Sequence, residues 1–179
     1  MTPHSDADIL AVLSRNQEEG FRMLVERFQE PLYWYIRRLV VSHHDSEDVT
    51  QEVFVRIFRG LPNFRHHASL TTWVYRIATN ESLRHLRRNA ARSRELLGGE
   101  SAAPQEPYIN YEDLEAIALQ RAIARLPRRQ QLIFNLCYYD ELDYEQVAAI
   151  LGGRPSAAKA NYHLAKKSIK EQLLAELNN

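Results

Sequence analysis

Apolar residues recur at three- and four-residue steps along almost the whole chain, which is the spacing of one face of an α-helix. Phe21, Leu24, Val25 and Phe28 show this period, and the hydrophobic residues, 45% of the 179, do not form the alternating runs of strands. One long stretch, residues 90–112, departs from the period because two adjacent glycines and two prolines interrupt it. The sequence therefore predicts an all-α fold of two small helical domains joined by a flexible linker.

The domain boundaries expected from this interruption are 1–92 for the first domain, 93–112 for the linker and 113–179 for the second domain. In the first domain we expect Pro31 to open a helix, Asp45 or Ser46 to cap the next, and another helix to run from 71 to about 89. The helix after the cap should bury one apolar stripe, made of Val49, Val53, Phe54, Ile57 and Phe58. In the second domain we expect helices over about 114–126, 128–137, 144–151 and 155–177.

Composition excludes several classes of protein. No apolar run approaches the roughly 20 residues that span a bilayer, and the amino terminus lacks the basic start and apolar core of a signal peptide. We therefore expect a cytoplasmic, soluble protein without membrane insertion. Cys137 is the only cysteine, so the chain has no internal disulfide and no cysteine-based zinc site. We expect neither a metal nor a cofactor.

The net charge is zero, with 23 basic and 23 acidic residues, but the charges are unevenly distributed. Residues 65–94 hold seven arginines and a single acidic residue, Glu81, whereas residues 95–127 have a balance of −4. The aromatic residues Phe64, Trp73 and Tyr75 lie among these arginines. Because arginine neutralises phosphate and aromatic faces stack on unpaired bases, this segment suits single-stranded or melting DNA. A solvated helix face with ordinary core aromatics explains the composition equally well.

The segment 144–170 has the layout of a helix-turn-helix, with a short helix, the tight turn Gly152-Gly153 and a longer helix opened by Pro155. In the second helix the residues expected to pack against the domain are Ala158, Tyr162, Ala165, Ile169 and Leu173. A second face carries the basic residues Lys159, His163, Lys166 and Lys170. Such a helix enters the major groove of DNA, although an amphipathic helix with merely solvated lysines is the alternative.

Taken in order, these motifs resemble a bacterial RNA polymerase sigma factor of the extracytoplasmic-function class, the small members with only regions 2 and 4. The run 45–54 (DSEDVTQEVF) is similar to the helix with which that family grips the clamp coiled coil of core polymerase. The segments 61–65 and 70–80 resemble the part that melts and reads the −10 element. Residues 126–131 resemble the start of region 4, whose helix-turn-helix reads the −35 element. The resemblance covers nearly the whole chain.

The resemblance implies a factor that binds core polymerase and directs promoter-specific transcription initiation. The residues it implies for core-polymerase binding are Asp48, Gln51, Glu52, Phe54 and Arg56. Those implied for the −10 element are Asn63, Phe64, Arg65, Trp73, Arg76, Asn80, Arg84, Arg87 and Arg88. Those implied for the −35 element are Arg154, Ser156, Lys159, Ala160, His163, Lys166 and Lys167. The implied partners are the polymerase clamp coiled coil and flap, promoter DNA and an anti-sigma factor.

One departure concerns the recognition helix, where Ser156-Ala157-Ala158 and Asn161 replace the family's usual Gly-Thr-Val-like opening and central arginine. The family's −35 sequence preference therefore does not carry over to this chain.

Two other classes of protein remain as alternatives. A DNA-binding regulator could use the helix-turn-helix without polymerase, but it leaves the 45–54 motif and the arginine-aromatic segment unexplained. An enzyme is disfavoured because the histidine pairs 43–44 and 66–67 lack the spaced partners of a zinc motif. There is no phosphate-binding glycine loop, and Cys137 lies on an apolar helix face, where a structural thiol is more common than a nucleophile. We expect no enzymatic activity.

Overall fold

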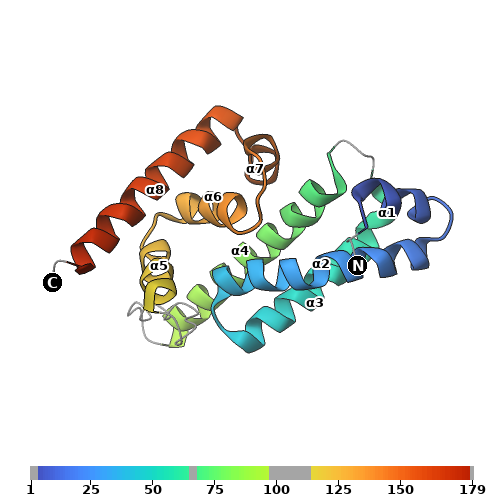
Figure 1. Cartoon of the computed structure of the whole chain (residues 1–179). Coiled ribbons are helices and arrows are strands. Elements are labelled where there is room, and N and C mark those ends of the chain that lie inside the picture. Colours follow the sequence, from blue (N-terminus) through green and yellow to red (C-terminus); the bar gives the residue numbers. More distant parts are fainter. Residues whose placement is uncertain (1–3, 65–67, 97–113, 178–179) are drawn as a thin grey trace. The chain divides into compact units, whose positions relative to one another are not determined.

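The structure is a computed structural model that describes residues 4–64, 68–96 and 114–177. Within these ranges the chain is helical throughout, with one 3-10 turn and no strand, as Figure 1 shows. It divides into two compact units, residues 1–103 and 104–179, which are described separately below. The all-α fold is confirmed. The domain and linker boundaries stay predictions, since residues 97–112 of the expected linker lie outside the described part of the chain.

Unit 1 contains the helices α1 (Asp6–Leu13), α2 (Gln17–Val40), α3 (His43–Gly60) and α4 (Leu70–Leu96), with the 3-10 turn η1 (Leu61–Asn63) after α3. Helix α2 packs against the other three helices, and α3 also packs on α4 (Figure 1). The core between them is formed by one stripe of each long helix. Its most completely buried large side chains include Leu24, Leu32, Tyr35, Ile36, Val53, Ile57, Leu70 and Val74.

Helix α2 corrects the expectation that Pro31 opens a new helix, because α2 runs through Pro31 without interruption. A proline inside a helix costs about 3 kcal/mol through the lost hydrogen bond and its steric clash. Phe28 and Leu32 on either side of it are buried, and so are Tyr35 and Ile36 one turn further on. Each such side chain contributes about 1.5–3 kcal/mol on burial, so keeping the stripe in phase outweighs the local cost.

Two other helix ends differ from expectation. Helix α3 is capped by Ser42, whose hydroxyl accepts a hydrogen bond from the backbone N–H of Asp45 at 3.2 Å. Ser46 is instead buried inside the helix, where its hydroxyl donates to the carbonyl of Ser42. Helix α4 continues to Leu96, past the expected end near Asn89 and into the first residues of the predicted linker. The run from 90 to 95 contains no glycine or proline, so nothing in it stops the helix.

Unit 2 contains α5 (Leu114–Ala124), α6 (Arg128–Tyr138), α7 (Tyr144–Leu151) and α8 (Pro155–Leu177). Helix α8 packs on the other three (Figure 1). One cluster joins α5, α6 and α8, and its buried members are Ala122, Ile123, Leu126, Phe134, Ala165 and Ile169. The bounds of α7 and α8 agree with the prediction. Between them Gly152 and Gly153 have φ of 72° and 126°, a left-handed conformation that glycine adopts without strain.

Candidate protein-docking and nucleic-acid interfaces

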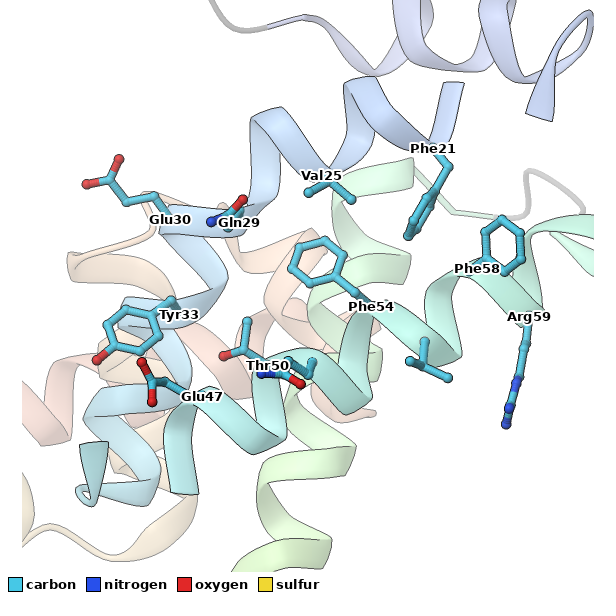
Figure 2. A pocket seen from close by; sticks show the side chains of 12 residues that line it. Phe21, Val25, Gln29, Glu30, Tyr33, Glu47, Thr50, Phe54, Phe58 and Arg59 are labelled. Carbon is cyan, nitrogen blue, oxygen red and sulfur yellow. The ribbon is translucent and has the colours of Figure 1, made fainter. Parts of the chain in front are cut away.

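An open groove of about 1090 Å³ runs between α2 and α3 of unit 1. Figure 2 shows Phe21 and Val25 of α2 facing Phe54 and Phe58 of α3 across it. The Phe21 ring meets the Phe58 and Phe54 rings edge-on, with centroids 5.0 and 6.5 Å apart. Val55 completes the apolar surface, and 46% of Val55 and 45% of Phe58 are exposed. The groove is thus an apolar surface that no other residue of the described chain covers fully.

This geometry corrects the expectation that Phe54 and Phe58 are buried with the rest of the α3 stripe. Val49, Val53 and Ile57 do face the core. Each phenylalanine follows a core residue by one position, a rotation of about 100° around the helix, which turns it away from the core and into the groove. An exposed apolar surface of this kind marks a site for another protein, and a groove between two helices suits a partner helix.

The rim of the groove is polar. Gln51, predicted for polymerase binding, lines it together with Phe54, and Glu30, Glu47 and Arg59 are among the charged residues around it (Figure 2). The other predicted polymerase residues, Asp48, Glu52 and Arg56, do not line the groove. They lie on the side of α3 that faces α4.

A cluster of four charged residues joins α3 to α4, and we call it the α3–α4 ion-pair cluster: Glu52, Arg56, Glu81 and Arg84. The Nε atom of Arg56 lies 2.9 Å from Glu81 and 3.3 Å from Glu52. Arg84 pairs with Glu81 and lies 3.6 Å from Glu52. The Glu81 side chain is only 9% exposed, whereas both arginine side chains are 40% exposed. Glu52, predicted for polymerase, therefore pairs with Arg84, predicted for DNA, and Arg56 is joined to Arg84 through Glu81.

The central residue of this cluster, Glu81, was not among the predicted site residues. The signal available in the sequence was its position as the single acid among seven arginines, three residues before Arg84. Next to the cluster, Asp48 and Arg88 line a small hollow of about 180 Å³ with His85. The His85 ring nitrogen lies 3.5 Å from Asp45, so a further polar contact joins α3 and α4 here.

The segment Leu61–Phe64 leads from α3 toward α4 and carries two predicted −10 residues. Asn63 is exposed, and the Phe64 ring packs on Trp73 with centroids 4.9 Å apart, so Trp73 braces this segment. A Cβ atom at Gly60 would lie 2.9 Å from the Trp73 ring, which explains the glycine there. Leu61, Pro62 and Phe64 also form one side of a hollow of about 200 Å³. Arg65 lies outside the described residues.

Helix α4 presents Arg76, Asn80 and Arg87 on its exposed side, while Val74, Ala78 and their neighbours face the core. Arg76, Asn80 and Arg84 follow one another at four-residue steps and so share one face. On this face Arg84 is held by the ion-pair cluster, which fixes a guanidinium near the exposed asparagine.

In unit 2 every residue predicted for the −35 element is exposed on or just before α8. Ala158, Ala165 and Ile169 are buried, as the apolar face predicted. The Lys166 ammonium lies 4.7 Å from the centre of the Tyr162 ring, an arrangement that keeps this lysine close to the helix. Arg129 was not predicted for this surface. Its guanidinium donates to the carbonyl of Gly152 at 2.7 Å and so adds a cation beside the turn.

The described residues contain no group of three or more histidine, cysteine or acidic residues that could hold a metal ion. Within the same ranges, none of the helices combines the length and the apolar character that crossing a membrane requires.

Comparison with known proteins covers both units. Residues 24–92 match the family described as Sigma-70 region 2, and residues 116–169 match the one described as Sigma-70, region 4. The RNA polymerase sigma-H factor of Pseudomonas aeruginosa is 26% identical, over 97% of this chain and 96% of that protein. The ECF RNA polymerase sigma factor SigW of Bacillus subtilis is 24% identical, over 90% of this chain and 92% of that protein.

A similar fold occurs in the sigma factor RpoE of Bartonella quintana, solved in complex with the anti-sigma factor NepR. The TM-score is 0.74 and the identity 20%, with 87% of this chain and 97% of that chain covered. Both regions are matched in their order along the sequence, and the relatives are matched over almost their full length. The chain belongs to the sigma-70 family of RNA polymerase sigma factors and has the two-region layout of its extracytoplasmic-function (ECF) members.

Proposed function

We propose that this protein binds core RNA polymerase and directs transcription initiation at specific promoters. Unit 1 melts and reads the −10 element, and unit 2 reads the −35 element. The observation that carries the proposal is the match to region 2 in unit 1 and to region 4 in unit 2 of one chain. The protein acts as an initiation factor without catalytic chemistry of its own and works in the cytoplasm with the polymerase.

The groove between α2 and α3 is the proposed docking site for the clamp coiled coil of the polymerase. An apolar floor with Phe54 and Phe58 offers burial to a partner helix, and Gln51 and Glu47 at the rim offer hydrogen bonds and charge. Asp48, Glu52 and Arg56 extend this surface toward α4. Docking at α3 therefore places the polymerase next to the helix proposed to hold DNA. Unit 2 is proposed to contact the polymerase flap.

The −10 element is proposed to lie over Leu61–Phe64 and the exposed face of α4. A base that leaves the stack needs a pocket and a flat wall. The 200 Å³ hollow beside Phe64 supplies the volume, and the Phe64 ring, backed by Trp73, supplies a wall. Asn63 and Asn80 can form hydrogen bonds with bases, while Arg76, Arg84, Arg87 and Arg88 neutralise phosphates. Arg65 belongs to the same proposed surface on the resemblance alone.

The −35 element is proposed to receive the first turns of α8 in its major groove. Ser156 and Lys159 occupy the part of a recognition helix that contacts bases, and His163, Lys166 and Lys167 follow along the exposed side. Arg154 and Ala160 complete the predicted surface. The lysines of α8 neutralise phosphates, so replacing Lys159 by alanine should reduce the magnitude of the negative slope of log K against log salt by about 1.

We also propose that an anti-sigma factor holds the protein inactive. Support comes from a structural relative, CnrH, which was solved in complex with the cytosolic domain of CnrY. Its TM-score is 0.70 and its identity 21%, with 93% of this chain and 95% of that chain covered. The exposed groove of unit 1 is a surface that such a protein could cover in place of the polymerase.

The test is transcription by purified core polymerase from a promoter library, with and without this protein. We expect new transcripts from a subset of promoters only when both are present. A specific footprint by the free protein on duplex DNA, without transcription, would instead support a regulator that acts without polymerase.

The docking site is tested by Phe58→Glu, which puts a charge into the apolar groove. We expect its affinity for core polymerase to fall at least about tenfold, the loss that truncating a central interface residue produces. Leu174→Glu is the matched control, since Leu174 is 49% exposed on α8, far from the groove in sequence. Equal affinity of wild type and Phe58→Glu would remove the groove from the proposal.

A further inference from the structure

The carboxylate of Asp6, the first residue of α1, is bonded to a helix that lies 65 residues further along the chain. It accepts hydrogen bonds from the backbone N–H of Thr71 at 3.0 Å and from the Thr71 hydroxyl at 2.8 Å. It also accepts a bond from Arg27 of α2 at 2.6 Å. Asp6 and α1 lie before residue 24, where the match to region 2 begins.

Asp6, Arg27 and Thr71 form a closed hydrogen-bonded cluster that joins α1, α2 and α4. Arg27 donates one bond to Asp6 and another to the Thr71 hydroxyl at 3.2 Å, and the Asp6 and Arg27 side chains are 26% and 22% exposed. The N–H groups of the first helical turn have no partner inside the helix, and the helix dipole favours a negative charge there. Asp6 therefore caps α4 from a different helix, next to the local cap that Ser69 provides to Thr72.

The rest of α1 lies across a hollow from the segment Leu61–Phe64. Leu10 and Leu13 form the other side of the 200 Å³ hollow that Leu61 and Phe64 line. The end of α1 packs closely against α2, since a Cβ atom at Gly20 would lie 2.6 Å from the Leu13 side chain. One short helix thus faces the segment that leaves α3 across this hollow and is bonded to the first turn of α4.

We propose that α1 is a brace that sets the position of Leu61–Phe64 against the first turn of α4, with Asp6 as its positioning residue. This inference rests on the proposed function of that segment in opening the −10 element. Asp6 touches no DNA in the proposal. It acts through Thr71, because releasing the start of α4 frees Trp73, the ring on which Phe64 packs.

The test measures promoter opening by wild type and Asp6→Ala as full-length proteins with core polymerase. Opening of duplex promoters is followed by permanganate reactivity of unpaired thymines, and activity on promoters already unpaired over the −10 element is followed by the transcripts formed. We expect Asp6→Ala to open duplex promoters about tenfold more slowly, the size of effect that losing one hydrogen bond to a charged group produces. Its activity on the unpaired template and its affinity for core polymerase should equal those of wild type.

Asp8→Ala is the matched control. Asp8 lies in the same turn of α1, but among the described residues its carboxylate bonds only to Ser5, at 2.9 Å to the backbone N–H and 2.6 Å to the hydroxyl. We expect wild-type opening from it. An equal loss with Asp8→Ala, or an equal loss on both templates with Asp6→Ala, would show a general weakening of the unit and overturn the positioning role.

A normal opening rate with Asp6→Ala would also overturn the inference. Failure of the proposed function itself would look different, since wild-type protein would then open no promoter with core polymerase.

Discussion

The two units differ in how their buried and partly buried polar groups are accommodated. In unit 1 several of these groups are paired across helices: Glu81 of α4 with Arg56 of α3, Asp6 of α1 with Arg27 of α2, and the Tyr35 hydroxyl with that of Thr79 at 2.8 Å. In unit 2 burial acts on two partly buried groups, since it raises the pKa of Tyr162 and raises the pKa of Cys137 to about 11.

The difference bears on how each unit combines folding with function. In unit 1 the charges that hold α3 to α4 belong to the surfaces proposed for polymerase and promoter, so a change to one surface disturbs the other. In unit 2 the core is an apolar cluster, and the proposed DNA face of α8 consists of exposed side chains that the core does not use. Mutations should therefore separate folding from DNA binding in unit 2 more easily than in unit 1.

The largest effect that would sharpen this comparison concerns the thiol of Cys137. Burial, with a smaller contribution from Asp143, raises its pKa from 9.0 to about 11, so at pH 8 the folded protein holds about 100-fold less thiolate than the unfolded chain. We expect alkylation by iodoacetamide to be slower by about that factor in the folded protein than in urea. Equal rates would show that folding does not desolvate the Cys137 thiol.

The same shift has a consequence for stability at high pH. The unfolded thiol loses its proton near pH 9, whereas the folded thiol keeps it up to about pH 11. The unfolded state therefore binds fewer protons in this range, and the stability of unit 2 should fall as the pH rises from 9 to 11. Cys137→Ser should remove that part of the pH dependence.

The second effect concerns the ion-pair cluster of unit 1. Glu81→Ala leaves Arg56 and Arg84 without the buried carboxylate that pairs with both. We expect this to lower the free energy of unfolding of unit 1 by about 2 kcal/mol, which is roughly 30-fold in the folding equilibrium. Both tryptophans, Trp34 and Trp73, lie in unit 1, so their fluorescence during urea unfolding reports on this unit alone.

Glu171→Ala in unit 2 is the matched control for Glu81→Ala. Glu171 pairs with Lys167 at 3.9 Å, and both side chains are largely exposed, so we expect a loss below about 0.5 kcal/mol. If the two substitutions had equal effects on their own units, the contrast in how the units use ion pairs would be wrong.

The parts of the structure that the sequence predicted well depend on local signals. The bounds of α7 and α8 follow from an Asp143 cap, a glycine pair and Pro155, each of which acts within a few residues. The bonds between Asp6 and Thr71 and between Arg56 and Glu81 join residues 65 and 25 positions apart, and helical periodicity carries no information about such partners. Pro31 was misjudged for the same reason, because only tertiary burial on both sides keeps α2 continuous.

The candidate site shows the same limit. Exposure of the basic face of α8 was predictable, since its lysines alternate with an apolar stripe at helical spacing. The groove could not be predicted from the sequence. Phe54 and Phe58 lie beside the core stripe of α3, and the sequence pattern alone does not distinguish them from residues within the stripe. Their exposure depends on how α2 packs against α3, which the sequence pattern of α3 does not contain.

The smallest expected effect comes from two substitutions that should change the free energy of unfolding in opposite directions. Asn135 of α6 is fully buried, and its side-chain nitrogen and oxygen have no hydrogen-bond partner among the described residues. Asn135→Leu removes two unpaired polar atoms and adds apolar surface, so we expect unit 2 to gain about 1 kcal/mol. Thr79→Val in unit 1 removes the bond to the Tyr35 hydroxyl, and we expect a loss of about 1 kcal/mol there.

Amide hydrogen exchange of α6 measures the first of these changes and tryptophan fluorescence the second, so each unit is read by its own probe. The two side chains are both almost wholly buried, at 0% and 2% exposure, which removes accessibility as an explanation for any difference between them. A loss of stability with Asn135→Leu would mean that the amide has a role in the native state of unit 2. Both units would then stabilise their buried polar groups by pairing, and the contrast would rest on Cys137 and Tyr162 alone.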